Sequence, residues 1–314
     1  EIGQYNQLPD NFAHLPSDVQ EMLLDYAGIS VEASKHWGRE FRVPTSKAYI
    51  KYLDDYQSRS IVDFNRGQIN IETLATSDPK KALEQAIVTT LLTPSDPNQV
   101  EIFSANNVEF NGRPFLLGRV LDNQGKQIRY LWRAQTFAKY LVNHELAVQQ
   151  TSEGKKFSVK IPMVRGYEQL GAQKYASHVR RQSRRFGIPQ DLIYGIMETE
   201  SSFNPYAVSS APAYGLMQVV PYTAGRDVFR RIKGVDYDPT KEYLFKPANN
   251  IETGTAYLSI LRDIYLKDIK HPLSKEYCII SAYNGGAGNV LKTFSSNILG
   301  SCFFSCSNLI TLSD

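Results

Sequence analysis

The pattern of apolar residues changes at Pro162, and this change constrains the fold more than any other feature of the chain. Before Pro162, short runs alternate apolar with polar residues, as half-buried β-strands do. After it the chain reads as helices separated by Gly, Pro, Ser and Asn, with no further alternating run. The sequence therefore predicts an α+β region followed by an all-α region, with a boundary near Val164.

Residues 1–164 are expected to form an α+β domain with an antiparallel sheet. One hairpin is predicted from the alternating runs 60–64 and 68–74, and a second from 115–121 and 127–132. Because hairpins join neighbouring strands directly, those strands should be antiparallel. A last strand is predicted over 157–161, and helices over 17–37 with Ser17 as N-cap, 78–92 and 135–148.

Residues 165–294 are expected to form an all-α domain. The predicted helices cover 169–186, 189–201, 223–232, 249–266, 274–283 and 288–294. The long loop 203–214 between two of them is typical of functional sites. Residues 295–314 form an atypical tail, rich in Ser, Cys, Leu and Phe. We interpret the tail either as a closing helix or as an altered C-terminus.

Composition excludes several classes of protein. A length of 314 residues favours two domains, and the net charge of +3 is too small to imply nucleic acid as a partner. No apolar run approaches the roughly 20 residues that span a bilayer. Cysteines 278, 302 and 306 are odd in number and lack histidine partners for zinc, so we expect no disulfide framework and no metal. Because the chain starts at Glu1 without Met, we expect any export signal to lie upstream.

A carboxylate continues the apolar face of the helix predicted over 189–201. The stripe runs through Ile193, Ile196 and Met197, and the next position on that face is Glu200. Burial would raise the pKa of Glu200 and keep it protonated near neutral pH, as a general acid requires. The alternative is a carboxylate at a fraying helix end that points into water.

Three short motifs follow in order. ESSFNP occupies residues 200–205, GLMQ residues 215–218 and AYNGGAG residues 282–288. Because Pro205 cannot continue a helix, the helix should end beside Glu200. Taken singly, each motif also fits a packing turn or a helix cap.

As an ordered set, these motifs resemble the catalytic domain of lytic transglycosylases, a group related to goose-type lysozymes. The resemblance extends over roughly residues 167–294. The first domain is similar to the N-terminal region of one member of this family, in segments such as KAYIKYLDDYQSRSIVDFNRGQINIETLA at residues 47–75. The resemblance implies a lysozyme-like fold for the all-α domain.

The resemblance also implies an activity. Glu200 would protonate the β-1,4 bond between N-acetylmuramic acid and N-acetylglucosamine, then take a proton from the muramic C6 hydroxyl to leave a 1,6-anhydromuramyl end. Attack within the substrate and its acetamido group can replace the second carboxylate of an ordinary glycosidase. The implied substrate-binding residues are Ser201, Ser209, Gln218, Tyr283 and Asn284.

The implied partner is the peptidoglycan glycan strand, with no cofactor, no metal and no nucleic acid. The implied location is the periplasm, with attachment to the outer membrane through a lipidated cysteine upstream of Glu1. Two other functions stay open at this point. A lysozyme-type hydrolase would use Glu200 with water in place of the C6 hydroxyl, and an inactive peptidoglycan-binding protein would fit the aberrant tail.

Overall fold

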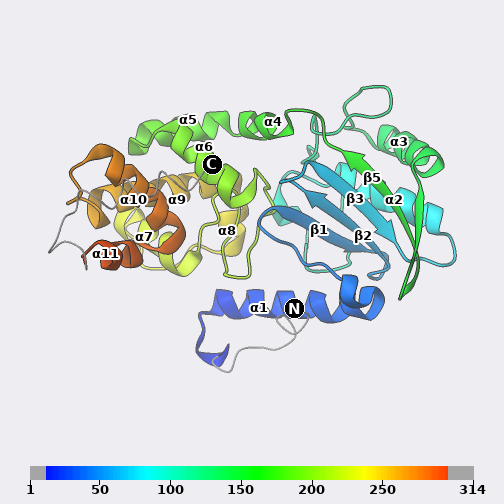
Figure 1. The fold of residues 1–314 in the computed structure, drawn as a ribbon, viewed down its shortest axis with the longest axis horizontal. Helices are drawn as coiled ribbons and strands as arrows, with labels where there is room; N and C mark the ends of the chain where they lie inside the picture. Colours follow the sequence, from blue (N-terminus) through cyan, green and yellow to red (C-terminus); the bar gives the residue numbers. More distant parts are fainter. Residues whose placement is uncertain (1–11, 296–314) are drawn as a thin grey trace.

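The structure is a computed structural model that describes residues 12–295, as a β-sheet region joined to a helical region (Figure 1). One antiparallel sheet holds five strands in the order β1-β2-β3-β5-β4. The strands are β1 (Ala48–Leu53), β2 (Ser58–Asp63), β3 (Gln68–Thr73), β4 (Ala147–Thr151) and β5 (Gly154–Pro162).

Strand register explains why the sheet needs cover on both faces. Tyr49, Val62, Ile69 and Ile161 lie opposite one another across four strands, and all four are buried. This row packs on α2 (Pro79–Leu92), and α3 (Leu131–His144) packs against α2. Side chains alternate between the two faces of a sheet, so the next row begins on the opposite side with Ile50.

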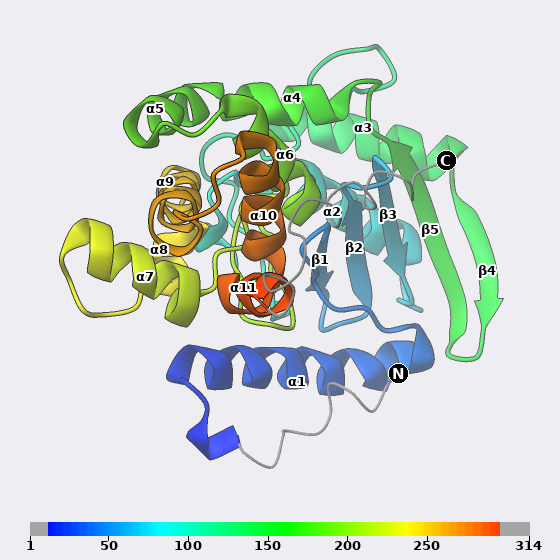
Figure 2. The same ribbon diagram turned by 60° about the vertical axis from the view of Figure 1, so that its left-hand side comes forward.

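Helix α1 (Ser17–Trp37) covers part of that opposite face. Ile29 and Trp37 pack against Ile50 on β1. Figures 1 and 2 both show α1 running beneath the sheet and the helical region. In the N-terminal half of α1, the Asp25 carboxylate accepts a hydrogen bond at 2.7 Å from Lys241 Nζ at the start of α8 (Lys241–Phe245). The helix therefore connects the two regions.

The helical region surrounds α9 (Pro247–Ile260), whose side chains are largely buried. Short π-helical turns at 221–225 and 229–233 flank α7 (Arg226–Val228), and another at 261–265 extends α9. The other helices are α4 (Tyr167–Lys174), α5 (Ala176–Phe186), α6 (Gln190–Ser201), α7 (Arg226–Val228), α8 (Lys241–Phe245), α10 (Pro272–Gly285) and α11 (Ala287–Ser295).

The predicted fold class is confirmed. The β2–β3 hairpin, α1, α2 and β5 lie where the sequence pattern places them, and the chain after Pro162 contains no named strand within the described residues. The helix predicted over 169–186 is interrupted at Tyr175, between α4 and α5. Ser17 is not the N-cap of α1, because Pro16 holds that position without a side-chain hydrogen bond. Residues 296–314 of the predicted tail lie outside the described residues.

The second predicted hairpin is wrong, and the sheet obtains its remaining strands elsewhere. Residues 115–130 form turns with isolated bridges, and α3 begins at Leu131 rather than Gln135. The alternation arose because single side chains of this loop, such as Phe115 and Ile128, enter the core. Strand β1 was missed because five of its six residues are buried, which removes the alternation. Strand β4 was missed because its residues are mostly exposed.

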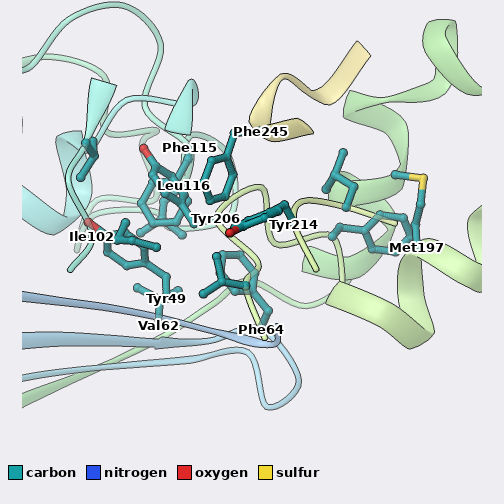
Figure 3. Close-up of a cluster of buried hydrophobic side chains, with 14 of the residues drawn as sticks. Tyr49, Val62, Phe64, Ile102, Phe115, Leu116, Met197, Tyr206, Tyr214 and Phe245 are labelled. Carbon is teal, nitrogen blue, oxygen red and sulfur yellow. The ribbon is translucent and has the colours of Figure 1, made fainter. Parts of the chain in front are cut away.

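One buried cluster extends from the sheet into the helical region (Figure 3). Tyr206 lies at its centre, with its ring centroid 4.9 Å from that of Tyr49 and 5.3 Å from that of Phe115. The Tyr206 hydroxyl donates a hydrogen bond to the Pro94 carbonyl at 2.5 Å. The loop after α6 is thus bound into the first region, while the division near Val164 stays a prediction.

We expect Tyr206→Ala to lower the free energy of unfolding by about 3 to 5 kcal/mol, since it removes a fully buried ring and leaves the Pro94 carbonyl without its donor. Urea denaturation monitored by circular dichroism would measure the change. Tyr130→Ala serves as the control, because Tyr130 is 58% exposed and its loss should cost less than about 0.5 kcal/mol. Equal losses in both variants would contradict a central role for Tyr206.

Candidate active site

Glu200 lies in the last turn of α6, directly above a buried apolar stripe. Ile193 and Met197 on the same face are fully buried, while Glu200 itself is half-buried. Burial raises the pKa of the Glu200 carboxyl, and the positive charge of Lys47 partly opposes that effect. The side chain is therefore not the freely solvated carboxylate of the alternative interpretation.

The helix ends sharply after Glu200. Ser202 and Phe203 both take left-handed backbone conformations, with φ of 48° and 60°. Such a conformation is costly for a residue other than glycine and persists only where its surroundings hold it. The surroundings here come largely from the first region of the chain.

Two hydrogen bonds join this turn to residues of the first region of the chain. The Asn204 Nδ2 donates to the Ser46 carbonyl at 3.1 Å, and its Oδ1 accepts from the Tyr206 backbone N–H at 3.0 Å. The buried guanidinium of Arg119 donates to the Phe203 carbonyl at 3.3 Å. The C-terminal end of the left-handed pair is therefore tied to the first region, which limits the freedom of the turn beside Glu200.

Ser201 has a structural role rather than the predicted contact with substrate. It is fully buried, and its Oγ lies 2.9 Å from the Met197 carbonyl and 2.8 Å from the Leu216 carbonyl. The hydroxyl thus links α6 to the loop that carries GLMQ. A buried hydroxyl engaged in this way has no face to offer to a sugar, so Ser201 is removed from the predicted binding residues.

The loop 214–219 is held by Asn250 on α9. The Asn250 Oδ1 accepts from the Met217 N–H at 2.8 Å, and its Nδ2 donates to the Tyr214 carbonyl at 2.7 Å and the Leu244 carbonyl at 2.9 Å. Gly215 has a φ of 72°, and a Cβ there would stand 2.5 Å from Asn250 Nδ2. The first residue of GLMQ must therefore be glycine for the loop to reach this asparagine.

Tyr283 on α10 closes the other side of Glu200. Its hydroxyl donates to the Met217 carbonyl at 2.7 Å, next to Gln218 in the same loop. The pKa of the Tyr283 hydroxyl is raised well above its usual value, chiefly by burial and then by the negative charge of the Glu200 carboxylate. The structure thus brings together residues from three separate motifs at Glu200.

The remaining predicted residues are placed less closely. Gln218 is buried and donates through Nε2 to the Gly215 carbonyl at 3.0 Å, a bond that engages neither its Oε1 nor the second amide N–H. Ser209 is half-buried in the loop after α6, and its hydroxyl donates to the Ala211 carbonyl. Asn284 is exposed near the end of α10.

The sequence analysis missed Lys47, Arg119 and Asn250. Nothing in the local pattern around Lys47 or Arg119 connects them with Glu200, because the proximity arises from packing of the two regions. Asn250 had no signal that set it apart, since α9 also contains polar residues such as Asn249 and Thr253.

A single acidic group carries the chemistry that this site can perform. Asp191 and Glu198, the other carboxylates of α6, are exposed. Residues 12–295 contain no cluster of three His, Cys, Asp or Glu side chains that could hold a metal. Two cavities of about 510 and 400 Å³ line other parts of the described surface, and neither includes Glu200. The site suits proton transfer by one partly dehydrated carboxyl group.

We expect Asn250→Ala to destabilise the protein by about 2 to 4 kcal/mol, because a buried N–H and two buried carbonyls lose their partner. Thermal and urea unfolding would measure the loss. Asn249→Ala is the matched control, since that half-buried side chain donates only to the Tyr243 carbonyl, at 3.2 Å. A loss from Asn249→Ala as large as that from Asn250→Ala would show that Asn250 does not hold the loop.

Comparison with known proteins identifies the family. Residues 17–174 match the profile described as "Membrane-bound lytic murein transglycosylase C, N-terminal domain", and residues 177–298 match the "Transglycosylase SLT domain". None of the described helices meets the length and apolarity needed to cross a membrane.

Individual relatives agree with these profiles. Membrane-bound lytic murein transglycosylase C from Yersinia enterocolitica is 48% identical over 297 residues, which cover 94% of this chain and 82% of the relative. The protein of that name from Serratia proteamaculans is 49% identical, over 83% of this chain and 73% of its own. A solved structure of an inactive mutant of lytic transglycosylase Slt from Pseudomonas aeruginosa aligns at 28% identity and a TM-score of 0.30, over 37% of this chain and 17% of that one. With profiles and relatives covering most of its length, the chain belongs to the membrane-bound lytic murein transglycosylase C family.

Proposed function

We propose that this lytic transglycosylase cleaves the β-1,4 bond between N-acetylmuramic acid and N-acetylglucosamine, with Glu200 as its acid and base. The observation that carries the proposal is the half-buried Glu200 carboxyl with a raised pKa, enclosed by Tyr283 and the loop of Gln218. A carboxyl group in such surroundings holds its proton to higher pH than a solvated one.

The reaction needs only one carboxyl group. Protonated Glu200 donates its proton to the glycosidic oxygen as the bond from that oxygen to the muramyl C1 breaks. The acetamido oxygen of the substrate supports the positive charge that develops at C1. The Glu200 carboxylate then accepts the proton of the C6 hydroxyl, whose oxygen forms the new bond to C1. Glu200 regains its proton, and the product carries a 1,6-anhydromuramyl end.

The polar groups around Glu200 have suitable chemistry for the sugar. The Oε1 of Gln218 can accept a hydrogen bond from an acetamido N–H, while the Tyr283 ring provides a wall. Ser209 is proposed to lie beside the bound glycan, and Asn284 to complete the wall that Tyr283 forms, in keeping with the family resemblance of their motifs. The role of Ser201 in this proposal is to hold the GLMQ loop in place.

Family membership favours the transglycosylase over the two alternatives. Digestion of purified sacculi with this chain, followed by mass spectrometry of the fragments, distinguishes all three. We expect 1,6-anhydromuramyl ends. Reducing muramyl ends would indicate a hydrolase, and binding without cleavage would indicate an inactive protein.

We propose that the enzyme acts on the periplasmic side of the outer membrane, attached through a lipidated cysteine upstream of Glu1. The words "membrane-bound" in the names of the relatives support an association with a membrane. Separation of inner and outer membranes from cells that produce the protein with its upstream residues would test the location. Recovery in the inner-membrane or soluble fraction would contradict it.

We expect Glu200→Gln to reduce the rate of sacculus cleavage by about 100-fold or more, because an amide cannot donate the proton. Release of anhydromuropeptides over time would measure the rate. Glu198→Gln is the matched control, since it makes the same change on an exposed position of the same helix and should retain most activity. Substantial activity in Glu200→Gln would refute the assignment of Glu200.

The same substitution should also change how stability depends on pH. The folded protein holds the Glu200 proton more tightly than the unfolded chain, so wild-type stability falls as pH rises from the unfolded pKa of about 4.3 through the raised folded pKa. Glu200→Gln removes this loss. The variant should therefore be more stable than wild type near pH 7, and the advantage should disappear below about pH 4. Urea denaturation at a series of pH values would measure the stability of both proteins. A stability difference that stays the same at every pH would contradict the prediction.

A further inference from the structure

The turn before β1 has a fixed geometry that presents Lys47. The Thr45 N–H donates to the Ala48 carbonyl at 3.0 Å, and the Ala48 N–H donates back to the Thr45 Oγ1 at 3.0 Å. The Lys47 carbonyl accepts from the Phe64 N–H at 3.0 Å, which ties the turn to the end of β2. The backbone of Lys47 is therefore held on both sides, although its side chain is half-exposed.

This turn lies against the catalytic turn. Ser46, the residue before Lys47, accepts the hydrogen bond from Asn204 that fixes the end of α6. Lys47 is accordingly the residue of the first region whose charge acts on Glu200. No direct ion pair joins the two among the described side chains.

We propose that Lys47 is the electrostatic partner of Glu200, and that its ammonium group stabilises the carboxylate formed when Glu200 gives its proton to the glycosidic oxygen. The inference rests on the proposed function and adds a residue that the first region supplies to the reaction. In this role Lys47 acts through Glu200 and is a positioning residue rather than a catalytic one.

The other groups near Glu200 cannot take this role. Tyr283 faces Glu200 from α10, and its neutral hydroxyl donates to the Met217 carbonyl. The guanidinium of Arg119 is engaged by the Phe203 carbonyl. Glu198 is exposed on α6 and carries a negative charge, which would disfavour a second carboxylate. Lys47 is the cation whose charge opposes the effect of burial on Glu200.

The two effects on Glu200 suit its two tasks. Burial favours the protonated acid that the first step consumes, while a nearby cation favours the carboxylate that the second step requires. Without Lys47 the carboxylate would form less readily, and the proton would be retained to higher pH. The variant enzyme should be slower, and its activity should persist further into the alkaline range.

The test is the pH dependence of kcat/KM on soluble peptidoglycan fragments for wild type, Lys47→Gln and Lys47→Arg. We expect Lys47→Gln to move the alkaline limb to higher pH, because removal of the positive charge leaves the Glu200 carboxylate less stabilised. The maximal kcat should fall by about 3- to 10-fold with little change in KM. Lys47→Arg should restore both, because it keeps the charge.

Lys139→Gln is the matched control, since it removes one exposed lysine from α3, on the far side of the sheet region from α6 (Figure 1). Its pH profile should coincide with that of wild type. An alkaline limb that does not move in Lys47→Gln would overturn the inference, as would a rise in KM alone, which would assign Lys47 to substrate binding. Failure of the proposed function is distinguishable, because wild type itself would then release no anhydromuramyl product.

Discussion

The attachment of the loop after α6 to the sheet region is the constraint on which the rest of the site depends. Tyr206 fills the aromatic cluster beside Tyr49, and two residues earlier Asn204 donates to the Ser46 carbonyl. These contacts hold a backbone with two successive left-handed residues, a conformation that the local sequence alone would not keep. The position of Glu200 is therefore a property of both regions together.

Chemistry at Glu200 follows from a balance between burial and charge. The stripe below Glu200 removes water and raises its pKa, and Lys47 acts in the opposite direction. Tyr283 and Asn250 both reach the loop 214–219, from α10 and α9, so the wall beside the carboxyl is assembled from distant segments. A shift in any of these packing contacts would therefore change the proton affinity of Glu200, even where the residues that move do not contact its carboxyl group.

Much of the fold could be predicted because short-range patterns report it. The β2–β3 hairpin showed alternation around a turn, and Asp78 before Pro79 marked the start of α2, where it accepts a hydrogen bond from the Lys81 N–H. Strand β1 was not predicted because its residues are buried on both faces, so apolar and polar residues do not alternate along it. The loop 115–130 was predicted as strands because single side chains of the loop enter the core and produce an alternating pattern.

By itself the sequence determined the class of the two regions and the motif order that resembles lytic transglycosylases. Helical periodicity placed Glu200 on an apolar face, and the resemblance of the motifs then selected it as the acid. Only the tertiary structure decided that Ser201 faces inward and that Asn250, Arg119 and Lys47 support the site. The reason is physical: periodicity describes which side of an element is buried, whereas contacts between residues far apart in the chain arise only when the elements pack.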